Sequence, residues 1–197
     1  MQPNDYLNQI APKPPKKPLQ NHMVRLGIIG AGLIVLVIIL SVVATSISNS
    51  RRAPAERLSV RIDTTQTIAD ESQGTLRSSQ LRSLNSDLRL FFTNTKRDIG
   101  EPLATVGVTP QSINQSIVTE ETSRAEAISQ RLEDARLNAV FDRTYAREMA
   151  FQLSTVLTLL QEVHAGTSNQ SVRDFTDATY ENLEPLQAGF ENFNETN

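Results

Sequence analysis

The sequence predicts an all-α protein, in which a four- to five-helix up-down bundle follows a single N-terminal transmembrane helix. A stretch without any charged residue, Leu26–Ile47, precedes a long region in which apolar residues recur at spacings of three and four. That spacing is typical of one face of an α-helix. The alternation of apolar and polar residues that is typical of strands never persists. We therefore expect antiparallel helices packed at shallow angles.

The composition limits the classes of protein that the chain can belong to. The chain carries a net charge of −3, to which residues 1–25 contribute +3 and the remaining residues −6. An acidic domain is a poor binder of nucleic acid because phosphate contacts need Lys and Arg. The chain has no cysteine, so disulfides and thiolate metal sites are excluded. The expected segments are a Pro/Lys-rich disordered cytoplasmic tail (1–23), the transmembrane helix (24–48), a linker (49–55), an extracytoplasmic helical bundle (56–193) and a disordered C-terminus (194–197).

The N-terminal tail is rich in proline, which keeps it from forming a helix. Its run APKPPKKP is typical of an extended segment. Two roles are open to this run. One is a basic tail whose lysines are attracted to anionic lipid headgroups. The other is a polyproline ligand that binds an SH3-like groove.

The apolar stretch is long enough to be a membrane anchor. A helix over Leu26–Ile47 would cover about 33 Å, and a hydrocarbon core is about 30 Å thick. Its GIIGAGLIV run lacks the third glycine of a dinucleotide fingerprint, because Val35 stands there. Gly27 and Ala31 instead offer a small-residue face to a second membrane helix. The run exceeds the roughly 7–15 residues of a signal-peptide core, so we favour an uncleaved anchor over a cleaved signal peptide.

The orientation of the anchor follows from the lengths of its flanks. Lys and Arg near the membrane are balanced on the two sides, so the positive-inside rule does not decide it. Long domains translocate largely regardless of charge, whereas a short tail with clustered lysines resists translocation. We expect a single-pass protein of the cytoplasmic membrane, with the N-terminus in the cytoplasm and the C-terminal domain outside.

The first part of the bundle shows two apolar stripes. Pro54 suits a helix start, with Glu56 in the first turn. The stripes are Leu58, Ile62, Thr65, Ala69, Ser72 and Leu76, followed by Leu81, Leu84, Leu88, Phe91, Thr95 and Ile99. The pattern resets around Ser78–Ser79. This leaves open whether one bent helix or two helices cover residues 56–99.

A loop and a third helix follow. Gly100 and Pro102 end the second stripe, and we expect a loop with a turn at VGVTP over Glu101–Thr119. Glu120 and Glu121 lie near the N-terminus of the third helix, where the helix dipole favours them. The expected buried face of this helix is Ala125, Ile128, Leu132, Ala135 and Ala139.

The last two helices have the clearest patterns. The stripe of the fourth helix is Phe141, Tyr145, Met149, Leu153, Val156, Leu160 and Val163. His164 lies in its last turn, and Gly166 follows as the C′ residue. Ser168 or Asn169 caps the fifth helix, whose stripe is Val172, Phe175, Thr179, Leu183, Leu186 and Phe190. Pro185 is expected to kink this helix or to end it early.

The domain lacks the residue patterns of known reactive centres. A carboxylate di-iron site needs Glu-x-x-His pairs, and Gln161 stands three residues before His164, the one histidine of the domain. The same imidazole would be the only base for a serine nucleophile. We interpret His164 as a cation or hydrogen-bond donor near a helix C-terminus. Glu133–Asp134 and Asp70–Glu71 are interpreted as solvated charged faces. We therefore expect no catalytic residue, no cofactor and no metal site.

Several runs of this chain resemble a family of uncharacterised exported bacterial proteins that form a ferritin-like helical bundle. These runs are FDRTYAREM (Phe141–Met149), VRDFTDATYENLEPL (Val172–Leu186), ADESQGTL (Ala69–Leu76), FFTNTK (Phe91–Lys96) and LATVGVTP (Leu103–Pro110). The resemblance covers residues 56–193 and implies a ferritin-like fold with a periplasmic or outer-membrane location. Family members carry histidine at three positions that hold Asn94, Leu153 and Gly189 here. The resemblance therefore implies that the chemistry of those histidines is lost.

Three functions follow as expectations. The first is a non-enzymatic, membrane-anchored helical-bundle protein of the bacterial cell envelope with a structural or protein-interaction role. Its partners would be the lipid bilayer and an envelope protein, without nucleic acid. The second is an extracytoplasmic ligand-binding or sensing module that acts through a partner, because the tail is too short for a signalling domain. The third is a ferritin-like metal-dependent protein.

Overall fold

The computed structural model describes residues 52–193, and in this range it contains helices and turns but no strand. The helices are one over residues 52–72, α2 (Ser79–Asp98), α3 (Gly100–Thr105), α4 (Gln115–Leu137), α5 (Phe141–Gly166) and α6 (Gln170–Glu191). The all-α prediction is therefore confirmed for this part of the chain. The predicted tail, transmembrane helix and C-terminal residues 194–197 lie outside the described residues. None of the helices between residues 52 and 193 is long and apolar enough to cross a membrane.

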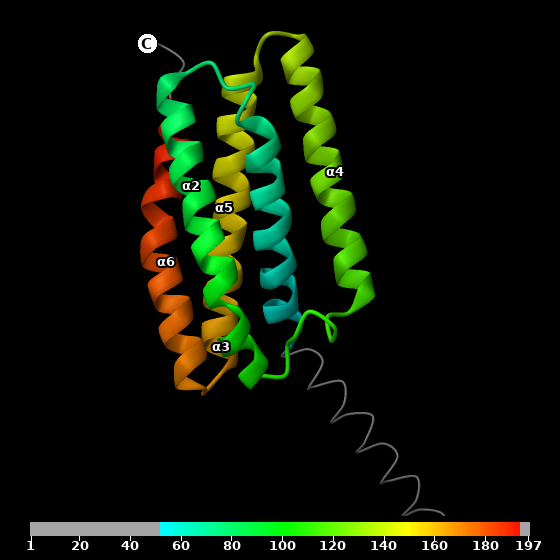
Figure 1. Cartoon of the computed structure of the whole chain (residues 1–197), viewed down its shortest axis with the longest axis vertical. Coiled ribbons are helices and arrows are strands. Elements are labelled where there is room, and N and C mark those ends of the chain that lie inside the picture. Colours follow the sequence, from blue (N-terminus) through cyan, green and yellow to red (C-terminus); the bar gives the residue numbers. More distant parts are fainter. Residues whose placement is uncertain (1–51, 194–197) are drawn as a thin grey trace, which may run out of the picture. The chain divides into compact units, whose positions relative to one another are not determined.

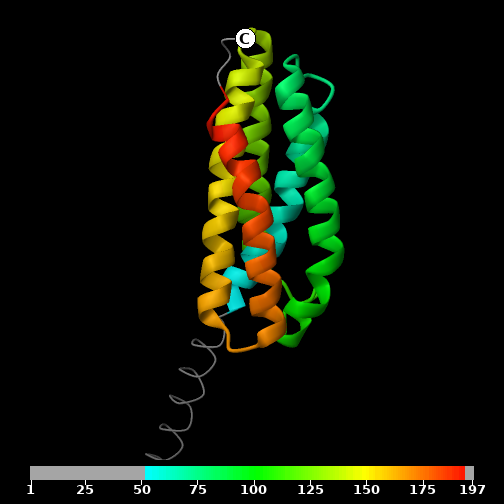
Figure 2. The same cartoon turned by 90° about the vertical axis from the view of Figure 1, so that its left-hand side faces the viewer.

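The five long helices run along a common axis and alternate in direction (Figure 1). Residues 73–78 and 138–140 therefore lie at one end of the bundle, and α3 and the α5–α6 loop lie at the other. The helix over residues 52–72 lies between α2 and α4, while α5 and α6 pack side by side along their length (Figure 2). All these helices belong to one unit, Ser48–Asn197.

Residues 56–99 form two helices rather than one bent helix. The break falls where the stripe resets, and Ser78 caps α2 by accepting a hydrogen bond from the Leu81 N–H at 3.4 Å. All six residues of the first predicted stripe are buried. In α2, the pattern missed Asn85 and Phe92, which are both fully buried. Asn85 directly follows the stripe residue Leu84, and Phe92 directly follows the stripe residue Phe91. The buried face of α2 is therefore wider than the predicted stripe.

The linker predicted over residues 49–55 is shorter in the structure, because residues 52–55 are already helical. Arg52 forms an ion pair with Glu56 one turn later, with 3.2 Å between Nη2 and Oε1. Ala55 is buried in the core. This local pair and the burial extend the helix towards the N-terminus.

The predicted loop over Glu101–Thr119 is wrong at both ends. Residues from Gly100 to Thr105 form α3, since Pro102 lies in the first turn, where its missing N–H breaks no helical bond. At the other end α4 begins at Gln115, because the Asn114 side chain accepts a hydrogen bond from the Ser116 N–H at 2.9 Å. Residues 106–114 form the actual connection.

The predicted faces of the last three helices are largely confirmed. In α4, Ile128, Leu132 and Ala135 are buried, but Ala139 is exposed. The prediction for Ala139 is wrong because α4 ends at Leu137 and Ala139 adopts a φ of 57° in the turn to α5. The α5 stripe from Tyr145 to Val163 is buried throughout.

The ends of α5 and α6 differ in detail from the prediction. Gly166 is the last residue of α5, and Thr167 takes the C-cap position. Asn169 caps α6 by accepting from the Val172 N–H at 3.2 Å. An early end at Pro185 is wrong, because α6 continues to Glu191. Buried Leu183 and Phe190 hold the helix in the core on both sides of the proline.

Candidate functional site

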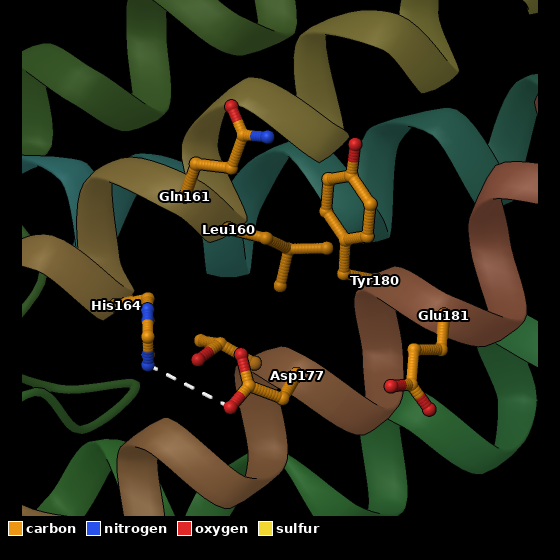
Figure 3. Close-up of a pocket in the computed structure, with 7 residues that line it drawn as sticks. Leu160, Gln161, His164, Asp177, Tyr180 and Glu181 are labelled. Atoms are coloured by element: carbon orange, nitrogen blue, oxygen red, sulfur yellow. Dashed lines mark ion pairs between the residues drawn. The ribbon is translucent and has the colours of Figure 1, made fainter.

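A pocket between α5 and α6 contains the one histidine of the bundle (Figure 3). Its volume is about 290 Å³. The lining residues are Leu160, Gln161 and His164 from α5, and Thr176, Asp177, Tyr180 and Glu181 from α6. The sequence singled out His164 but gave no sign of the residues of α6 that face it. The antiparallel packing of the two helices brings them together.

His164 and Asp177 form the central pair of this pocket. The distance between His164 Nε2 and Asp177 Oδ2 is 3.6 Å, and both side chains are accessible to solvent. The pair is ionic only when the imidazole is protonated. Exposed ion pairs contribute about 0–1 kcal/mol. His164 also lies in the last turn of α5, where the helix dipole favours a cation. The pair therefore joins two helices and offers polar atoms to a ligand.

The pocket does not assemble a metal centre. In Figure 3 the Glu181 carboxylate lies on the far side of Asp177 from His164, so the three groups do not converge. Gln161 presents an amide where a Glu-x-x-His pair would have a carboxylate. Between residues 52 and 193, no group of three or more His, Asp or Glu side chains has the geometry to hold a metal ion.

The polar residues of the FDRTYAREM run hold the bundle together. The Asp142 carboxylate accepts hydrogen bonds from the N–H of Arg77 at 3.1 and 3.2 Å, and from the N–H of Ser78 at 2.6 Å. The Tyr145 hydroxyl donates to Asn85 Oδ1, and both side chains are fully buried. Burial raises the pKa of Tyr145 far above its ordinary value. Asn85 in turn donates to the carbonyl of Ala69 at 2.9 Å.

A buried ionic cluster joins the helix over residues 52–72 to α4 and α5. Arg61 Nη2 lies 2.5 Å from Glu121 Oε2, and the two side chains are 3% and 0% exposed. Arg61 also donates to Gln152 Oε1 at 2.6 Å, and Arg57 donates to Glu121 Oε1 at 2.7 Å. Desolvation lowers the pKa of Arg61, and the charge of Glu121 opposes this effect.

Sequence reasoning missed this cluster although a signal was present. Glu121 lies four residues after Ile117 and seven before Ile128, which places it on the buried stripe of α4. Arg61 falls three residues after Leu58, on the buried face of its own helix. A charged residue on an apolar face indicates a buried partner. The pattern does not reveal which residue that partner is.

The acidic pairs interpreted as solvated faces are exposed. Asp70 forms an ion pair with Arg89 of α2. Glu133 forms an ion pair with Arg136 one turn along α4, with 2.6 Å between Oε1 and Nη2. Both ion pairs lie on the surface of the bundle.

The three positions at which the resemblance implies histidine differ in their surroundings. Leu153 is fully buried in the core, and Asn94 is exposed beside a pocket between α2 and α6. A Cβ atom on Gly189 would lie 2.7 Å from Leu84 Cδ2. Ten residues of α2, or about 15 Å of helix, separate Leu84 from Asn94. The three positions therefore lie in three different environments.

Comparison of the chain with protein-family models, with curated proteins and with solved structures gives no significant match in any of the three. The geometry of the bundle and the sequence are therefore the basis for a functional proposal.

Proposed function

We propose that the chain is a non-enzymatic, single-pass protein of the bacterial cytoplasmic membrane, in which a ferritin-like helical bundle outside the cytoplasm binds another component of the cell envelope. The observation that carries this proposal is the use of the buried polar groups as braces between helices. Asp142 holds the loop before α2, and Tyr145 holds α2 and the helix over residues 52–72 through Asn85. The ionic cluster of Arg61 and Glu121 holds α4.

Such braces favour a rigid binding scaffold over a reactive centre. Buried polar groups that pair across helices rigidify a core and favour one arrangement of the helices. A scaffold of this kind presents a fixed outer surface to a partner. The charge-free stretch Leu26–Ile47 supports attachment to a membrane, because its length suits a hydrocarbon core.

The proposed location is tested on intact spheroplasts that contain the full chain. Protease added outside should digest the C-terminal domain, and the chain should resist extraction from membranes at alkaline pH. A domain that stays protected would overturn the orientation. A chain that alkaline extraction releases would overturn the anchor.

The proposed interaction role is tested by crosslinking the full chain in its own membrane. The matched control keeps residues 1–51 and replaces the bundle with an unrelated four-helix bundle. A partner crosslinked only to the native bundle would support the proposal. If the same proteins are crosslinked to both chains, the bundle has no interaction role of its own.

A ligand-binding or sensing module is the second candidate, and the pocket around His164 favours it. That pocket combines an imidazole and two carboxylates with the Tyr180 ring. Sites for small molecules combine an apolar wall with a few polar groups in this way. Saturable thermal stabilisation by one compound of a metabolite panel, lost in His164→Ala, would favour this candidate.

A further inference from the structure

A second concave site lies at the end of the bundle that carries residues 73–78 and 138–140. Its volume is about 690 Å³. Its lining includes Arg77, Arg82, Arg136 and Asp142. Three guanidinium groups thus border one cavity, and they come from the loop before α2, from α2 itself and from α4. We call it the arginine cavity.

The carboxylate in the arginine cavity is already bonded. Asp142 accepts two contacts from the N–H of Arg77 and one from the N–H of Ser78. These bonds satisfy most of the acceptor capacity of the carboxylate. They also fix the loop from which the Arg77 side chain projects. Asp142 therefore shapes the cavity and leaves its guanidinium groups available.

Arg82 is held in place by backbone oxygens. Its Nη1 donates to the carbonyl of Leu76 at 3.2 Å and to the carbonyl of Arg77 at 2.7 Å. Among the described residues, no bond uses its Nε or Nη2. A guanidinium that is anchored through one nitrogen presents the others as a pre-organised pair of donors.

The two other arginines add charge and free donors. Arg136 uses Nε and Nη2 for Glu133, at 2.7 and 2.6 Å, and Nη1 remains. The Arg77 side chain is exposed and forms no ion pair within residues 52–193. The N-termini of α2 and α5 also begin beside this cavity, and their dipoles favour an anion.

We propose that the arginine cavity binds an oxyanion group, a phosphate or a carboxylate, of an envelope component. Guanidinium groups match both anions because two parallel N–H donors meet two oxygens. This inference deepens the proposed interaction role, and it rests on that role only for the source of the ligand. The chemistry of the site itself follows from the three arginines.

The test uses the full chain in a neutral detergent, with unfolding followed by circular dichroism. Inorganic phosphate and succinate are titrated separately at constant ionic strength set with NaCl. At about five times the dissociation constant, a bound oxyanion should raise Tm by about 2–4 °C. Arg77→Gln should weaken binding about tenfold, because it removes one charged hydrogen-bond donor group. Stabilisation by phosphate alone would identify a phosphate source, and stabilisation by succinate alone a carboxylate source.

The matched control is Arg147→Gln, an exposed arginine of α5 that does not line the arginine cavity. It should bind like the native chain. Equal weakening in both variants would show diffuse ionic attraction and overturn the inference, as would the absence of a saturable shift with either anion. Arg136→Gln is a second variant, and it should weaken binding in the same direction. If the native bundle still crosslinks to its own partner but neither anion binds, this inference is overturned while the proposed interaction role stands.

Discussion

Helices α4 and α5 are held in the bundle by different forces. Eleven of the 26 residues of α5 are buried, whereas α4 buries five of 23, and one of those five is Glu121. From α4, only Ile128 and Leu132 belong to the cluster of buried hydrophobic residues that forms the core. Apolar burial therefore fixes α5, and α4 depends on its ion pairs to a larger extent.

The ion pairs of α4 are concentrated in its first half. Glu120 and Glu121 pair with Arg57, and Glu121 also pairs with Arg61. A buried ion pair contributes little net stability over apolar residues of the same volume, yet breaking it is costly. The comparison teaches that α5 stabilises the fold through apolar burial, while the ionic cluster specifies where α4 docks. The following predictions test this difference, from the largest effect to the smallest.

Glu121→Leu should have the largest effect. It leaves Arg61 charged and buried without its carboxylate, which costs about 3–5 kcal/mol. Urea unfolding of the full chain, followed by circular dichroism, measures the loss. The double variant Arg61→Met with Glu121→Leu should recover most of it, because no unpaired charge remains. A double variant as unstable as the single one would refute the ion-pair explanation.

Leu153→Ala tests the apolar side of the comparison. Leu153 is fully buried in α5, and its truncation should cost about 2–5 kcal/mol through lost burial and a cavity. The control is Leu132→Ala in α4, at a site with 4% exposure. We expect a smaller loss for Leu132→Ala in the same urea experiment, since fewer core residues surround it. A larger loss at Leu132 would reverse the assignment of forces.

Tyr145→Phe removes one hydroxyl from the centre of the bundle. Asn85 Oδ1 then lacks its buried donor, which should cost about 1–3 kcal/mol. The ring remains, so its edge-to-face contact with Phe190 at 6.0 Å between centroids is kept. Chemical denaturation checks the value. Tyr180→Phe, at a half-buried residue that lines the pocket between α5 and α6, is the control and should leave stability unchanged.

Glu120→Gln should have the smallest effect and a characteristic pH dependence. The hydrogen bond and charge of Arg57 lower the pKa of Glu120 to about 2. Because this folded-state pKa is depressed, its contribution is present above the ordinary pKa and is lost as pH falls from about 4.5 towards 2. The difference in the free energy of unfolding between the native chain and the variant should shrink as the pH falls over this range. It should also shrink in 1 M NaCl at neutral pH, because salt screens the exposed ion pair.

Hydrogen exchange of α4 amides separates this role from a general charge effect. The control is Glu133→Gln, which removes an exposed pair within α4 and no link between helices. Only Glu120→Gln should speed opening of α4 relative to α5. Equal exchange in the two variants would mean that Arg57 and Glu120 do not hold α4.

Much of the fold could be predicted because its causes are local. The stripes from Leu58 to Leu76 and from Tyr145 to Val163 depend on spacings of three and four, which the sequence states directly. The cap residue Asn169 acts on an N–H three residues away. The error at α3 was also local. The predicted end of α2 before Gly100 is confirmed, but the loop predicted from Glu101 is wrong, because a proline in the first turn is compatible with a new helix.

The sequence alone determined the helical class of the bundle and most of the face that each helix buries. Only the tertiary structure decided which residues meet. Arg61 and Glu121 lie 60 positions apart, as do Asn85 and Tyr145, and no periodicity relates them. The tertiary structure also gathered Arg77, Arg82 and Arg136 around one cavity. The physical reason is that helix formation depends on residues that are close in the sequence. Pairing across helices depends instead on how the whole bundle packs.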